Sequence, residues 1–118
     1  MDSKPTFRVY TKAKFDYSLT IRNGTVILAP TNSSDLHQAQ LTKYKSDEFD
    51  VTVLWTNGHS LGDGYYQIRP VYNMHLKLDA GQKIKKYGYV HDGAKPILWG
   101  WNNSDHQKWT IFPYYIYA

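Results

Sequence analysis

The sequence of 118 residues contains no cysteine, which excludes disulfide bonds, thiolate nucleophiles and zinc sites built on cysteine ligands. It also lacks any apolar run near the roughly 20 residues that a membrane-spanning helix requires. The first residues contain no apolar signal segment, so we expect a location in the cytoplasm and nucleus. Charge is modest as well: 14 Lys and Arg stand against 10 Asp and Glu, and this net charge of +4 is not by itself a nucleic-acid signature.

Aromatic residues are abundant, since the chain contains 11 Tyr, 4 Trp and 4 Phe. Aromatic and β-branched residues favour strands, and no window shows the 3.6-residue period of an amphipathic helix. The length corresponds to one domain of the usual size of roughly 100–200 residues. We therefore predict a single all-β domain.

Short segments with strand-like alternation recur along the chain, separated by turn signals such as Asn23-Gly24, Asn57-Gly58 and Gly62-Asp63-Gly64. This spacing of short strands is typical of a sandwich or barrel. The nine predicted strands lie at residues 7–10, 17–21, 25–28, 39–44, 51–55, 65–71, 75–78, 97–101 and 108–112.

The chain also repeats itself. Residues 25–35 align with 95–105 at an offset of 70, whereas residues 19–20 align with 78–79 at an offset of 59. The second copy therefore carries about eleven extra residues in the loop 81–95. Two copies of a four-strand unit and one spare strand account for the nine strands, because a single unit cannot bury its own apolar face.

Residues 107–109, Gln-Lys-Trp, match the Gln-x-Trp hallmark of ricin-B-type lectins. Residues 17–24, 53–56, 90–93 and 97–101 further resemble the Euonymus-lectin-type (EUL, R40) domain of plants, in the right order. The resemblance implies a β-trefoil, which is built from three repeats of four strands.

Compared with that family, the middle repeat is truncated. The resemblance treats residues 1–118 as one ricin-B/EUL-like domain, with a first repeat at about 6–45, a middle remnant at about 46–58 and a third repeat at about 64–113. We therefore predict an all-β, incomplete ricin-B-like β-trefoil with about nine strands instead of twelve. A collapsed nine-strand variant and a chain that lacks part of its natural sequence are both open. A homodimer or strand-exchanged oligomer that fills the gap is favoured, because missing strands expose sheet edges.

The resemblance also implies a sugar site in the third repeat, made of a carboxylate that accepts hydroxyl bonds, an aromatic platform and polar side chains. The first repeat has Thr20 and Ala29 at the acid and aromatic positions, so we expect one site per chain. The candidate carbohydrate-binding residues are Asp79, Trp99, His106 and Gln107, with Asp92 and Asn102 on loops that could reach the same pocket.

Each of these residues also has a structural interpretation. Trp109 is expected in the core, and Gln107 could bond backbone within its turn. Asp79 could be a plain turn residue before Ala80-Gly81. Trp99 and Trp101 lie two residues apart and could both simply pack.

Catalysis and metal binding are disfavoured. Residues 58–62 satisfy the G-x-S-x-G pattern of a hydrolase, but that motif requires a helix next, and Gly62-Asp63-Gly64 forbids one. None of the five His forms a ligand-spaced pair, so we predict no metal and no cofactor. The Lys-rich segment 83–87 resembles a surface for anionic glycans or single strands, although a solvated lysine cluster is favoured.

We therefore predict a non-enzymatic, carbohydrate-binding lectin with one shallow site in its C-terminal repeat. The resemblance implies mannose-rich or galactosylated N-glycans, carried by glycoproteins, as ligands. The alternative is a stress-related protein- or nucleic-acid-interaction module that has lost sugar binding, although nucleic acid is the less favoured partner.

Overall fold

A computed structural model describes residues 6–32, 37–38, 40–41, 55–81 and 90–114. This part of the chain folds as strands apart from one short 3-10 helix, η3, so the all-β prediction is confirmed. The strands are β1 (Thr6–Thr11), β2 (Tyr17–Arg22), β3 (Thr25–Pro30), β4 (His37–Gln38), β5 (Gln40–Leu41), β6 (Trp55–Ser60), β7 (Tyr66–Pro70), β8 (Leu76–Asp79), β9 (Ile97–Gly100) and β10 (Trp109–Tyr114), with η3 at Asp105–Gln107.

Turn chemistry explains the first hairpin. Strands β2 and β3 pair in register from Tyr17↔Pro30 to Arg22↔Thr25. The two residues between them, Asn23 and Gly24, have φ values of 52° and 74°. Two positive φ values match a tight hairpin turn whose twist follows that of the strands, and Asn-Gly is the favoured sequence for it.

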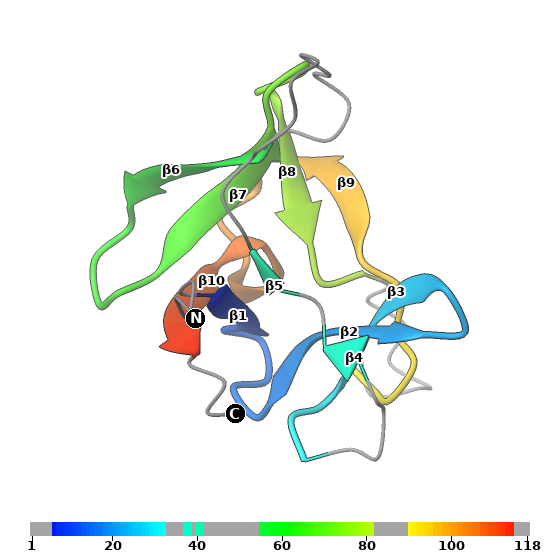
Figure 1. Ribbon diagram of the computed structural model, residues 1–118. Coiled ribbons are helices and arrows are strands. Elements are labelled where there is room, and N and C mark those ends of the chain that lie inside the picture. Colours follow the sequence, from blue (N-terminus) through cyan, green and yellow to red (C-terminus); the bar gives the residue numbers. More distant parts are fainter. Residues whose placement is uncertain (1–5, 33–36, 39, 42–54, 82–89, 115–118) are drawn as a thin grey trace, which may run out of the picture.

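The main sheet follows the order β3-β2-β1-β10-β7-β6, with β4 on β2 and β5 on β1. Figure 1 shows β1 and β10 between β6–β7 on one side and the β2–β3 hairpin on the other. The barrel strands run β5-β1-β10-β7-β6, and within the described residues the outer edges of β5 and β6 are unpaired. This open arc agrees with a trefoil that lacks strands of its middle repeat.

The third repeat contains a second hairpin, β8–β9, which forms a separate two-stranded sheet. It pairs Leu78 with Leu98, as the first hairpin pairs Leu19 with Leu28. The offsets of 59 and 70 relate these two pairs, so the hairpins share the register that the sequence repeat predicts.

The core lies where the two hairpins meet the barrel strands. Trp109, Leu28 and Val9 are buried there together with Ile68. The indole Nε1 of Trp109 donates to the carbonyl oxygen of Leu78 at 3.0 Å, so the polar atom of this buried ring is satisfied. The prediction that Trp109 belongs to the core is confirmed.

Strand β6 differs from expectation. Asn57-Gly58 lies inside the strand, which has a bulge between Asn57 and Ser60, and not in the turn that its sequence predicts. The turn comes later, at residues 62–64, where all three φ values are positive. Ser60 thus precedes a turn and no helix, so the geometry of a hydrolase nucleophile is absent at this position.

Some sequence predictions fall on undescribed residues. The predicted strands 39–44 and 51–55 are described only at residues 40–41 and 55, and the lysine-rich segment 83–87 lies outside the described residues. The short strand β4 has no counterpart among the predictions. Within the described residues, no helix has the length and apolar character needed to cross a membrane.

Candidate functional site

The β8–β9 hairpin brings two candidate residues onto one face. Lys77 pairs with Trp99, and Asp79 pairs with Ile97. Directly paired residues share a face of the sheet, and so do residues two apart in a strand. Asp79 and Trp99 are therefore diagonal neighbours on one face. The Trp99 side chain is 58% exposed there, whereas Asp79 is only 2% exposed.

Asp79 is held by the turn that follows it. Its Oδ1 accepts a hydrogen bond from the backbone N–H of Gly81 at 3.0 Å. Gly81 has a φ of 103°, and a Cβ at this position would lie 2.3 Å from the carbonyl oxygen of Lys95. Only glycine fits this turn without a shift of the backbone. Asp79 is thus a turn residue, and its Oδ2 makes no hydrogen bond to the described residues.

The Gln-x-Trp segment ties both strands of the hairpin to the barrel. On β9, Gln107 Nε2 donates to the carbonyl oxygen of Gly100 at 2.8 Å, and Oε1 accepts from the N–H of Asn102 at 2.8 Å. At β8, the N–H of Ala80 donates to the carbonyl oxygen of His106 at 2.7 Å, close to the Trp109 contact. Gln107 is completely buried, so it acts on the surface through the turn that it holds.

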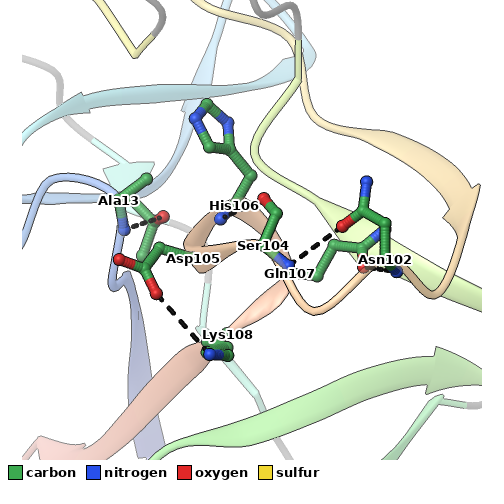
Figure 2. Close-up of polar contacts among 8 residues, drawn as sticks. Ala13, Asn102, Ser104, Asp105, His106, Gln107 and Lys108 are labelled. Atoms are coloured by element: carbon green, nitrogen blue, oxygen red, sulfur yellow. Dashed lines mark hydrogen bonds and ion pairs between the residues drawn. The ribbon is translucent and has the colours of Figure 1, made fainter.

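His106 and Asn102 flank a turn organised by Ser104. Ser104 Oγ caps η3 by accepting from the N–H of His106 at 3.0 Å, and its own N–H donates to Asn102 Oδ1 at 3.0 Å. Figure 2 shows His106 and Asn102 on opposite sides of Ser104, with the Asp105–Lys108 ion pair on the side away from Asn102. Asn102 is exposed and His106 is half-buried.

Asp92 is joined to the first repeat. Its Oδ1 lies 2.8 Å from Nη2 of Arg22, at the end of β2. Next to this ion pair, Leu28 of β3 exchanges backbone bonds with Gly93 and Ala94. The structure therefore gathers Asp79, Trp99, His106, Gln107 and Asn102 around the β8–β9 hairpin, whereas Asp92 is engaged by the β2–β3 hairpin.

Lys77 belongs to the same face but was not among the predicted site residues. It stands directly opposite Trp99, is almost fully buried and donates from Nζ to the carbonyl oxygen of Met74. Burial lowers the pKa of its ammonium, and the charge of Arg69 lowers it further. The sequence held a signal for this placement, because Lys77 lies two residues before Asp79 in a predicted strand.

The first repeat presents no comparable surface. Thr20 and Ala29, which correspond to Asp79 and Trp99, are both completely buried. This face of the β2–β3 hairpin therefore offers no exposed aromatic ring. Within the described residues, no three His, Asp or Glu side chains are grouped so that they could hold a metal ion.

Comparison with known proteins identifies the family. The chain is 35% identical to the ricin B-like lectin EULS3 of Arabidopsis thaliana, across 94% of this chain and 48% of that protein. It is 31% identical to the ricin B-like lectin R40G3 of Oryza sativa subsp. japonica, across 95% of this chain and 75% of that protein. The chain belongs to the ricin B-like lectins of the EUL/R40 type. No protein-family model matches the sequence.

A solved structure agrees with the fold. The designed three-fold symmetric protein ThreeFoil superposes with a TM-score of 0.65 at 14% identity, across 90% of this chain and 96% of that one. Together with family membership, this likeness supports the incomplete trefoil. The relatives are named as lectins and not as enzymes, in agreement with the non-enzymatic prediction.

The alignments also measure the truncation. The Arabidopsis relative aligns over 152 residues, whereas the whole chain has 118, so at least 34 aligned positions have no counterpart in this chain. The chain spans about half the length of three of its four curated relatives and three quarters of R40G3.

Proposed function

We propose that this chain binds glycans through the face of the β8–β9 hairpin that carries Trp99. The observation that supports this most is the exposed Trp99 ring beside the Asp79 carboxylate, on a hairpin anchored by Gln107 and Trp109. An exposed aromatic face packs against the C–H face of a sugar ring, and a carboxylate oxygen accepts bonds from its hydroxyl groups. An indole ring displayed this way favours a shallow, open site.

The side chains take different roles in this proposal. Trp99 is the platform, and Asp79 Oδ2 is the acceptor that is not used by the Gly81 turn. Asn102 and His106 supply further polar contacts from the η3 turn, and Gln107 positions that turn. Asp92 contributes only when its ion pair with Arg22 leaves an oxygen available.

One site per chain follows from the difference between the repeats. The first repeat buries Thr20 and Ala29 where the third has Asp79 and Trp99. The ligands that we propose are mannose-rich or galactosylated N-glycans on glycoproteins, as the named lectin relatives suggest.

The test is a glycan array followed by calorimetric titration of the best ligand. Trp99→Ala is expected to weaken binding at least about tenfold, which corresponds to about 1.4 kcal/mol. Trp55→Ala is the matched control, because Trp55 is a similarly exposed tryptophan (42%) on β6. Unchanged binding by Trp99→Ala, or an equal loss in both variants, would show that this face is not the site.

A second function is favoured by a different surface. Lys12 Nζ lies 4.8 Å from the centre of the Tyr65 ring, and Lys14 Nζ lies 4.6 Å from that of Tyr17. Between them and β2, Phe15 is 81% exposed. Such a basic and aromatic surface suits an anionic macromolecule, whose binding would weaken steeply with salt. Binding of an uncharged glycan should be insensitive to salt, so a salt titration separates the two functions.

A further inference from the structure

The outer edge of β9 is open where the same edge of β3 is covered. In the first repeat, Leu28 donates its N–H to the carbonyl oxygen of Ala94 at 2.7 Å and accepts from the N–H of Gly93 at 2.8 Å. Leu98 has the same position in β9, opposite Leu78 as Leu28 is opposite Leu19. Among the described residues, only β8 pairs with β9. Figure 1 shows β9 on the side of β8 that faces away from β7.

The internal repeat explains this difference. The segment that covers β3 belongs to the third repeat, which precedes the first in the cyclic order of a trefoil. By the same relation, the segment that covers β9 would belong to the middle repeat. That repeat is truncated, and at least 34 positions aligned in the Arabidopsis relative are missing from this chain. The missing cover must therefore come from another molecule.

The composition of the edge favours pairing. Residues 97–101, Ile-Leu-Trp-Gly-Trp, carry no charge, and Ile97, Trp99 and Trp101 are all exposed. Soluble proteins normally protect edge strands with lysine, proline or a covering segment, because an open apolar edge pairs with other chains. Two copies of this uncharged edge meet without the repulsion that opposes pairing of like charges.

We propose that a second copy of this chain covers the edge, with β9 pairing antiparallel to β9 of its partner about a two-fold axis at Leu98. An antiparallel pair of identical strands is self-complementary, as a closed dimer requires. The two Leu98 residues then exchange the two backbone bonds that Leu28 makes with Gly93 and Ala94. The bridge at Leu28 is itself antiparallel, so the geometry already occurs once in this fold.

This arrangement has a consequence for ligand binding, which rests on the proposed glycan site although the dimer itself does not. A two-fold axis between antiparallel strands is perpendicular to the sheet, so both Trp99 side chains lie on the same face of a four-stranded sheet. Two weak sites that face one way engage a branched glycan together, and avidity then exceeds the affinity of either site.

The test compares the solution mass of the natural chain with that of two lysine variants. Light scattering across micromolar concentrations is expected to give twice the 13.8 kDa chain mass for the natural protein. Gly100→Lys places a charge on the edge, and no atom within 4 Å obstructs a Cβ there, so this variant is expected to fold and be monomeric. Ser60→Lys, at an exposed position in β6, is the control and should remain dimeric.

Hydrogen exchange supplies a second measurement. The Leu98 amide should be protected in the natural protein and exchange faster in Gly100→Lys, whereas amides within the core should keep their protection. A monomeric natural protein, or a Gly100→Lys variant that remains dimeric with Leu98 protected, would overturn the proposal. Glycan binding is scored separately through Trp99→Ala, so a monomer that binds glycans sinks only the dimer, and a dimer without ligand sinks only the glycan site.

Discussion

The indole Nε1 of Trp109 is 3.0 Å from the carbonyl oxygen of Leu78, and this hydrogen bond joins the barrel strand β10 to the hairpin strand β8 across 31 positions of sequence. Both residues are buried. The bond therefore links the core directly to the strand that carries Lys77 and Asp79. Stability and site geometry thus depend on the same contact.

Trp109→Phe tests this link. The substitution leaves the carbonyl oxygen of Leu78 buried without this partner, and an unsatisfied buried group costs about 1–3 kcal/mol. We expect the free energy of unfolding in urea to fall by at least that amount. Trp101→Phe is the control at an exposed position, where changes usually stay within about 0.5 kcal/mol. Equal unfolding curves for the two variants would contradict this role of Trp109.

Gln107→Leu tests the turn between β9 and η3. It removes the bonds to Gly100 and Asn102, each contributing about 1 kcal/mol, so we expect a loss of about 2 kcal/mol. Faster hydrogen exchange of the Asn102 amide should accompany it. Gln67→Leu, at a half-buried glutamine of β7, is the control and should leave that amide unchanged. Slow exchange of Asn102 in Gln107→Leu would show that the turn holds itself.

Gly81→Ala tests the turn that fixes Asp79. The new Cβ would lie 2.3 Å from the backbone oxygen of Lys95, at a φ of 103° that alanine rarely adopts. We expect thermal unfolding at a clearly lower temperature than for Gly64→Ala. Gly64 also has a positive φ, of 79°, but open space around it, so the comparison isolates the collision from backbone strain. Similar melting temperatures would mean that the turn moves aside at little cost.

Lys77 makes stability depend on pH in the alkaline range. Burial lowers its pKa in the folded state below the 10.5 of the exposed group, so the unfolded chain binds more protons between these two values. The free energy of unfolding gained from this group therefore rises as pH increases across that window. Lys77→Met should lack this rise, whereas Lys95→Met, at an exposed position, should retain it. Urea unfolding at several pH values up to 10.5 measures both, and parallel profiles for Lys77→Met and the natural chain would refute the assignment.

Local sequence signals predicted much of this fold. Alternation predicted the strands around β1, β2, β3 and β7 to β10, and Asn23-Gly24 predicted the first hairpin turn. The signal at Asn57-Gly58 misled, because pairing with β7 absorbs these residues as a bulge. Tertiary pairing overrides turn preference when a neighbouring strand offers hydrogen bonds.

The candidate site was predictable only in part. The offsets of the internal repeat implied the shared register of the hairpins, and hence that Asp79 and Trp99 lie together. The sequence could not separate the platform from the support, because Gln107 and Trp99 are both plausible ligand contacts by type. Burial decides between them: Gln107 is enclosed and bonded to backbone at both ends, whereas Trp99 faces solvent.

Sequence alone thus determined the all-β class, the repeat, the buried Trp109 and the shortage of a middle repeat, because each depends on local pattern or chain length. Only the tertiary structure decided that Asp92 pairs with Arg22, 70 residues away, and that β9 has an open edge while β3 is covered. Such contacts join segments whose approach depends on how hairpins dock on the barrel. No short-range preference of the chain encodes that docking.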